Sequence, residues 1–155
     1  MTQVLYHYTT FGYLEEIIES KYLKVSPWEK KNNIERPALW LTKNPNWENS
    51  ATKGYFDKTT GESRYLTFEE QSYSFGCVRI TIPHNVSFCN WDEYKLCSKE
   101  PINLTRELEK IGLQQGSNPE DWYVSFEDVP ITEIIAVDFW NGVEWEDVLV
   151  EKIEN

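Results

Sequence analysis

The chain of 155 residues carries a formal net charge of −11, and its 7 Trp, 9 Tyr and 7 Phe supply enough apolar area to bury a core. Length and composition predict one domain over residues 1–155, and the small numbers of Gly and Pro argue against a disordered or fibrous chain. The cysteines lack the spacing of a zinc site and fit reduced thiols, and neither a membrane helix nor a secretion signal is visible, which predicts a cytoplasmic protein without a metal.

The first part of the chain predicts a strand followed by an amphipathic helix. Residues 4–8 form a short apolar stretch that contains His7, one of only 2 histidines. Thr9 or Thr10 is placed to cap a helix over about residues 10–20, in which apolar residues recur at helical spacing. An imidazole inside an apolar strand needs a hydrogen-bond partner, so His7 is a candidate site residue.

The next segment predicts a loop, a second strand and a second helix. Residues 28–36 are polar and predict a surface loop, whereas residues 38–42 predict a nearly continuous apolar strand that contains Trp40. Asn44 followed by Pro45 is typical of a helix start, so we expect a helix there. Its buried stripe would hold Trp47, Ala51 and Tyr55.

The remaining residues predict mainly strands, and the whole pattern predicts an α+β fold with small antiparallel or mixed sheets and short helices. The polar residues 57–73 would form a surface excursion, residues 76–82 and 123–126 would be strands, and Asn103 and Gly112 would cap the two ends of a helix. The most specific signal is Asn141-Gly142, which lies between the apolar stretches 133–140 and 143–150. This arrangement predicts a β-hairpin with a type I′ turn.

The order of these elements resembles the ADP-ribosyltransferase superfamily, in the branch shared by poly-ADP-ribose polymerases and bacterial DNA-modifying toxins. Leu5-Tyr6-His7-Tyr8-Thr9 is similar to the apolar-aromatic-His-polar-Ser/Thr strand that opens this branch. Leu39-Trp40-Leu41-Thr42, with Ser50-Ala51 and Tyr55 after it, is similar to the family's aromatic strand and small-residue helix, and residues 123–130 look like its third strand and turn. The resemblance implies a split-sheet core. It also implies that NAD is the substrate, with transfer of ADP-ribose to a macromolecular or small-molecule acceptor.

The resemblance further implies roles for individual residues. His7 would donate a hydrogen bond to, or accept one from, the adenosine ribose, and Thr9 would support the same cradle. Trp40 would stack on the nicotinamide, because an indole face offers a large contact area. The polar loop 28–36 would close over the cofactor and exclude water. Tyr8, Thr42 and Tyr55 belong to the same motifs and would complete the cofactor-binding set.

The catalytic carboxylate is the part of the pattern that the sequence leaves open. The family's glutamate begins the late strand, where it holds a ribose hydroxyl and stabilises developing positive charge. An alignment on Val129-Pro130 puts Trp122 at that place. Glu120 lies just before it and Glu127 just after it, so a shift of register would make either residue the catalytic carboxylate. We therefore predict that His7 and Trp40 share a cleft with a carboxylate from residues 120–128.

The charge distribution supports a second hypothesis. Residues 1–118 contain 15 acidic and 14 basic side chains, whereas residues 119–155 contain 11 acidic side chains and 1 basic one. Such a segment disfavours contact with a nucleic-acid backbone and fits either a solvated surface or an acidic inhibitor that blocks a basic partner without catalysis. The negative face of that inhibitor would consist of Glu120, Asp121, Glu144, Glu146, Asp147 and Glu151.

Overall fold

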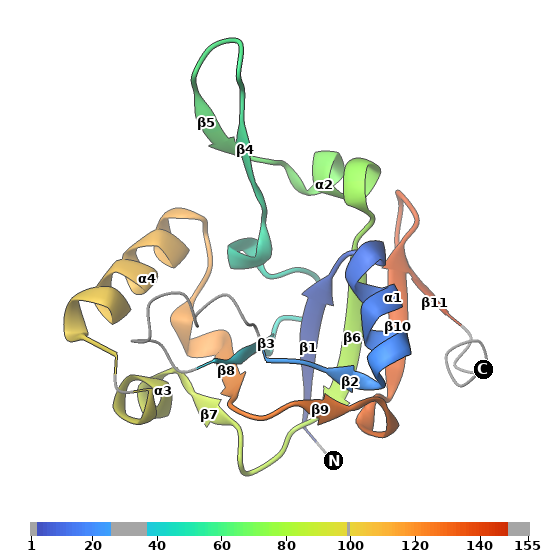
Figure 1. Ribbon diagram of the computed structural model, residues 1–155, viewed down its shortest axis with the longest axis vertical. Coiled ribbons are helices and arrows are strands. Elements are labelled where there is room, and N and C mark those ends of the chain that lie inside the picture. Colours follow the sequence, from blue (N-terminus) through green and yellow to red (C-terminus); the bar gives the residue numbers. More distant parts are fainter. Residues whose placement is uncertain (1–2, 26–36, 99, 149–155) are drawn as a thin grey trace.

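The computed structural model describes residues 3–25, 37–98 and 100–148, which form the α+β domain drawn in Figure 1. Within these residues the chain forms four α-helices, a seven-stranded antiparallel sheet and two two-stranded sheets. The predicted α+β class is therefore confirmed. The loop predicted over residues 28–36 lies outside the described residues. None of the helices in the described part of the chain has the length and apolar character needed to span a bilayer.

The helices are α1 (Phe11–Ser20), α2 (Phe68–Phe75), α3 (Trp91–Cys97) and α4 (Ile102–Gln114). The large sheet has the strand order β11-β10-β6-β1-β3-β8-β7. Its strands are β1 (Val4–Thr9), β3 (Leu39–Thr42), β6 (Val78–Pro83), β7 (Cys89–Asn90), β8 (Trp122–Ser125), β10 (Ala136–Trp140) and β11 (Trp145–Asp147). The small sheets pair β2 (Tyr22–Leu23) with β9 (Val129–Pro130) and β4 (Gly54–Phe56) with β5 (Ser63–Tyr65).

The two faces of the large sheet bury different kinds of side chain. One face holds an aliphatic core in which Leu5, Ile80 and Leu41 pack with Ile17 of α1. The opposite face holds an aromatic cluster that includes Trp91 and Tyr94 of α3 and Trp122 of β8, with Trp40 packed against it. Since successive side chains on a strand point to opposite faces, residues 39–42 contribute side chains alternately to the two clusters. Helix α1 is therefore held by aliphatic packing, whereas α3 is held by stacked rings.

The junction between β1 and β3 joins the two halves of the large sheet. On one side, β1 pairs with β6 over six residue pairs, from Val4↔Pro83 to Thr9↔Val78. On the other side, β1 and β3 share only the pair Tyr6↔Thr42. The backbone ladder between the two strands is therefore open beyond Tyr6, beside Trp40.

The helix predicted at Asn44-Pro45 is wrong. Residues 43–48 contain bends but no helix, and only a short 3₁₀ helix, η2 (Asn49–Ala51), follows them. Backbone carbonyls in this segment are used by remote side chains: Tyr8 donates to the Asn44 oxygen at 2.6 Å and the Trp145 indole donates to the Asn46 oxygen at 3.0 Å. These tertiary hydrogen bonds use carbonyls that a helix would have used internally, which explains why the local capping signal does not decide the structure.

The polar excursion predicted over residues 57–73 contains the turn and second strand of the β4–β5 hairpin and most of α2. The hairpin projects away from the rest of the molecule in Figure 1. Helix α2 begins after Thr67, whose hydroxyl accepts from the Glu70 amide at 3.1 Å while the Glu70 carboxylate accepts from the Thr67 amide at 3.0 Å. This reciprocal capping box fixes the start of a helix that the polar composition does not suggest.

Both caps predicted for the helix between residues 103 and 112 are wrong. Helix α4 has Pro101 at its N-cap and Gln115 at its C-cap, so Asn103 and Gly112 lie inside it. Gly112 is buried, and a Cβ atom built on it would lie 2.4 Å from the Trp122 ring. Glycine is thus required here for the close approach of an indole, not for the end of a helix.

The hairpin at Asn141-Gly142 is confirmed, but its predicted turn type is wrong. Strands β10 and β11 pair through Trp140↔Trp145, which leaves residues 141–144 as the loop. Only Gly142 has a positive φ in this loop, at 101°, whereas a type I′ turn requires two. The Asn141 side chain instead accepts from the amides of Val143 at 2.8 Å and Glu144 at 2.9 Å, which stabilises a longer turn.

Candidate functional site

A pocket of about 350 Å³ lies beside the opening between β1 and β3. Strand β1 supplies one side, β3 and β8 supply another, the segment around η2 covers a third, and α4 completes the wall. The lining residues are mainly aromatic and aliphatic, with a few polar groups among them. A small apolar pocket with convergent polar groups is the arrangement expected of a site for a small molecule.

His7 is among the residues that line this pocket. Its Nδ1 atom donates to the Trp40 carbonyl oxygen at 2.9 Å, where paired strands would carry a backbone hydrogen bond. Because a carbonyl only accepts, this bond places the proton of a neutral imidazole on Nδ1 and leaves Nε2 as an acceptor. Burial lowers the pKa of His7 below its ordinary value of 6.5, against the opposing effect of the bond to Trp40. The neutral ring is therefore fixed in one tautomer.

Glu48 is the charged side chain of the pocket lining. It is 7% exposed, and its Oε1 atom accepts from the Thr42 hydroxyl at 2.9 Å. Its Oε2 atom accepts from the Ser50 amide at 3.1 Å, the Ser50 hydroxyl at 2.6 Å and the Ser117 hydroxyl. The Trp122 indole N–H adds a further hydrogen bond to Oε2 at 3.2 Å. Five donors thus hold one carboxylate in a single orientation at the pocket wall.

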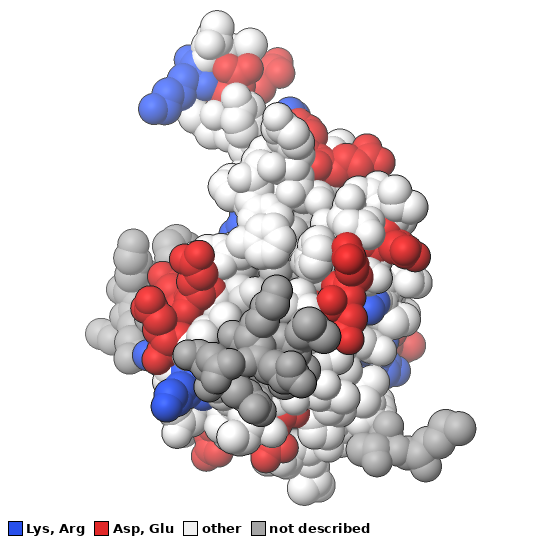
Figure 2. All heavy atoms as spheres, turned by 90° about the vertical axis from the view of Figure 1, so that its right-hand side faces the viewer, with Lys and Arg blue, Asp and Glu red and all other residues white. Residues whose placement is uncertain are grey.

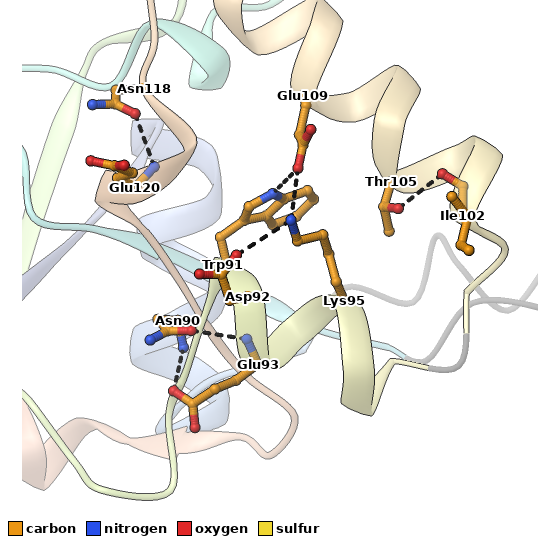
Figure 3. Close-up of polar contacts among 10 residues, drawn as sticks. All are labelled: Asn90, Trp91, Asp92, Glu93, Lys95, Ile102, Thr105, Glu109, Asn118 and Glu120. Atoms are coloured by element: carbon orange, nitrogen blue, oxygen red, sulfur yellow. Dashed lines mark hydrogen bonds and ion pairs between the residues drawn. The ribbon is translucent and has the colours of Figure 1, made fainter.

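The wall formed by Trp40 and Trp122 is backed by a second layer of rings. Trp91 contacts Trp122 edge to face at 5.1 Å, and Tyr94 lies 4.9 Å from Trp40. Figure 3 shows how α3 and α4 fix Trp91: its indole N–H donates to Glu109 at 2.6 Å, and Lys95 bridges Glu109 at 3.1 Å and Asp92 at 3.3 Å. The contacts between these two helices therefore support the indoles that face the pocket.

The other end of the pocket is held by a network around Tyr8. Its phenol packs 5.0 Å from the Trp47 ring and donates to the Asn44 carbonyl, and burial raises the pKa of Tyr8 well above its usual range. Arg79 holds the same bend through the Pro45 carbonyl and pairs with Asp138 at 2.9 Å. These bonds position the segment that carries Glu48.

The structure brings together most of the predicted binding residues. His7, Tyr8, Trp40 and Thr42 all line the pocket, as do Ser50 and Ala51. Thr9 does not line it and instead continues β1 opposite Val78. Tyr55 also lies away from it, on the projecting hairpin, where it is 45% exposed and carries the Arg64 guanidinium 5.2 Å from its ring centre.

The carboxylates predicted from residues 120–128 lie outside the pocket lining. Glu120 belongs to the 3₁₀ helix η3 (Pro119–Asp121), is exposed, and lies beside Asn118 in Figure 3. Glu127 is also exposed, and its backbone atoms bond to the Ser125 hydroxyl. Trp122, which stands where the family pattern has a glutamate, does line the pocket, and its indole holds Glu48. The carboxylate of this pocket therefore comes from a different element of the chain.

Sequence reasoning missed Glu48 for a physical reason. Its partners Ser117 and Trp122 are 69 and 74 residues away in the chain, so no local spacing indicates that it becomes buried. The one local signal is its position two residues before Ser50, whose amide and hydroxyl it accepts. That pattern is typical of a helix cap and, by itself, indicates no site.

The residues of the acidic face predicted between 120 and 151 come from separate elements of the fold. Glu120 and Asp121 precede β8, whereas Glu144, Glu146 and Asp147 lie at β11, and the sheet places β10, β6, β1 and β3 between those strands. Glu151 is outside the described residues. On the side drawn in Figure 2, acidic side chains form separate groups divided by uncharged surface. The acidic partner surface therefore remains a prediction.

Searches against protein-family models, curated proteins and solved structures found no match to this chain. The chemistry of the pocket therefore has to be inferred from its own geometry. A fixed acceptor nitrogen, an indole wall and a buried carboxylate border one cavity, and this set suits a ligand that carries hydroxyl groups and a flat ring.

Proposed function

We propose that this chain is an ADP-ribosyltransferase-like enzyme that binds the nicotinamide and adjoining ribose of NAD in the pocket beside β1. The observation that carries the proposal is that His7, Trp40 and the Glu48 carboxylate border one cavity. In this arrangement Trp40 stacks on the nicotinamide ring, and the Nε2 atom of His7 accepts a hydrogen bond from the ribose attached to that ring, not from the adenosine ribose to which the resemblance assigns it. The resemblance in residues 5–9 and 39–42 supports the same assignment.

The transfer step would use Glu48 as the residue that stabilises positive charge. The bond between the ribose C1′ and the nicotinamide nitrogen breaks, and its electron pair stays on the nicotinamide, which leaves as a neutral molecule. An oxygen or nitrogen of the acceptor forms the new bond to C1′ and releases its proton to solvent. A carboxylate beside the ribose lowers the energy of the oxocarbenium-like transition state, because the charge it faces develops only during the reaction. Glu48 takes the role that the sequence gives to Glu120 or Glu127.

Calorimetric titration with NAD tests the binding part of this proposal. We expect the wild-type chain to bind NAD and His7→Ala to bind it about tenfold more weakly, the effect of one lost hydrogen bond to the ribose. His84→Ala is the matched control, because His84 contacts Phe88 and Tyr123 and does not line the pocket. If the wild-type chain fails to bind NAD, or both histidine variants bind it equally well, the proposed site is wrong.

Nicotinamide release with water as the acceptor tests the catalytic part. We expect Glu48→Gln to slow release by at least about a hundredfold, as removal of a charge-stabilising group does in other enzymes. Glu120→Gln and Glu127→Gln should keep the wild-type rate, since both side chains lie outside the pocket. Circular dichroism confirms that each variant is folded. Wild-type activity in Glu48→Gln, or loss of activity in Glu120→Gln or Glu127→Gln, would reassign the carboxylate.

A further inference from the structure

The pocket combines several aromatic rings with one negative charge. The pair Tyr6↔Thr42 and the pair Thr42↔Trp122 put Tyr6, Thr42 and Trp122 on one face of the sheet, and alternation along the strands adds Tyr8 and Trp40 to that face. Glu48 lies over the same face, because it is bonded to the side chains of Thr42 and Trp122. Four rings and a carboxylate thus border one cavity.

The described residues that line this pocket include no Lys or Arg. Arg79 contacts the Tyr6 and Trp145 rings and is paired with Asp138, so its charge is already balanced outside the lining. Burial favours the neutral form of His7, against the opposing effect of the bond from its Nδ1 atom to the Trp40 carbonyl. The electrostatic potential inside the cavity is therefore set by Glu48 and by the negative faces of the rings, and both attract a cation.

We propose that this pocket selects a permanently charged N-alkylpyridinium ring over the neutral ring of the same shape. This inference deepens the proposed function and rests on it for the identity of the ligand. The nicotinamide of NAD is such a cation, whereas the dihydronicotinamide of NADH and free nicotinamide are neutral. The pocket therefore binds the oxidised dinucleotide in preference to the reduced one. It also binds its own product weakly, because cleavage of the bond to C1′ leaves the electron pair, and hence no charge, on the departing ring.

The size of the preference follows from the two attractions. A cation over an aromatic face and a carboxylate at the wall of a partly desolvated cavity together favour the charged ring by on the order of tenfold. A neutral ligand ring of the same shape still stacks on Trp40 with the same contact area and loses only the electrostatic attraction to Glu48 and the aromatic faces. The discrimination therefore depends on the charge of Glu48, and replacement of that side chain by an amide of nearly equal shape should remove most of it.

Competition between 1-methylnicotinamide and nicotinamide tests the inference, because the two probes differ by one methyl group and one charge. Quenching of tryptophan fluorescence gives their dissociation constants with the full chain. We expect wild-type protein to bind the cation about tenfold more tightly, and Glu48→Gln to bind both probes with similar affinity. Glu16→Gln, which removes an exposed carboxylate on α1, should keep the full preference.

The wild-type comparison alone is decisive if Glu48→Gln does not fold, since it needs no variant. Equal affinity of the wild-type chain for the two probes overturns the inference, and a preference that survives in folded Glu48→Gln overturns the role of Glu48. If NAD is bound and cleaved without a preference for the cation, the inference fails and the proposed function stands. If the cation is preferred and NAD is neither bound nor cleaved, the proposed function fails alone.

Discussion

Gly112→Ala offers a direct test of how α4 and β8 meet at the pocket. The added Cβ atom would lie 2.4 Å and 2.5 Å from two ring carbons of Trp122, well inside contact distance. The indole has little room to move, because it is 6% exposed and packs against Trp91 at 5.1 Å. Its N–H also holds Glu48, so any displacement of the ring disturbs the carboxylate.

The expected change in the free energy of unfolding is the difference between two opposing effects. Overpacking a well-packed site costs about 1–3 kcal/mol, whereas replacement of a glycine by alanine inside a helix returns up to about 1 kcal/mol. The net effect of Gly112→Ala is therefore a destabilisation of up to about 2 kcal/mol, equivalent to a fall in Tm of up to about 8 °C. NAD binding should weaken with it, since Trp122 and Glu48 both border the pocket.

Gly12→Ala provides the matched control. Gly12 is also helical, near the start of α1, but a Cβ atom there meets nothing within 4 Å. Only the difference in helix propensity between glycine and alanine applies, so this variant should be as stable as the wild-type chain or more stable by up to about 1 kcal/mol. Urea unfolding followed by tryptophan fluorescence measures both. A Gly112→Ala variant as stable as Gly12→Ala would show that the indole does not pack against α4 as described.

Two further predictions concern buried charge. Because burial lowers the pKa of His7 below 6.5, the unfolded chain takes up a proton below that pH before the native chain does. The contribution of the neutral His7 ring to the free energy of unfolding is full above pH 6.5 and should fall as the pH drops below that value, by up to about 1.4 kcal/mol per pH unit. In urea titrations His7→Gln should flatten this dependence while His84→Gln keeps it, and equal slopes in both would exclude His7 as the cause. Arg79→Met and Asp138→Asn should each cost about 1–3 kcal/mol, and a double-mutant cycle should give a coupling of at least about 1 kcal/mol, whereas strictly additive losses would mean that the pair adds nothing.

The parts of the fold that the sequence predicts well are those set by short-range periodicity. Strand β1, helix α1 and the paired strands around Gly142 all appear where alternation, helical spacing and turn residues place them. Helix α3 was not predicted, although its capping box is readable: Asn90 accepts from the Glu93 amide at 2.9 Å and Glu93 accepts from the Asn90 amide at 3.1 Å. A capping box in a polar segment starts a stable helix when its rings, such as Trp91, also pack against other side chains, here those of the aromatic cluster.

Only half of the candidate site could be predicted from the sequence. His7 and Trp40 sit on strands whose local pattern is strong, so their meeting follows from the order of the elements. Glu48 depends on Ser117 and Trp122, which no local pattern connects to it. The resemblance predicts a catalytic carboxylate within residues 120–128, because in the family the glutamate lies on the corresponding strand. Here the indole of that strand positions a carboxylate from elsewhere.

The single residue pair between β1 and β3 has a consequence for the dynamics of the molecule. The halves β11-β10-β6-β1 and β3-β8-β7 share few backbone hydrogen bonds at this junction, so they are expected to open as separate cooperative units, each with its own protection against amide hydrogen exchange. A ligand in the pocket would contact both halves of the sheet and so hold them together. Its arrival should therefore slow exchange in strands that it never contacts, on both sides of the junction.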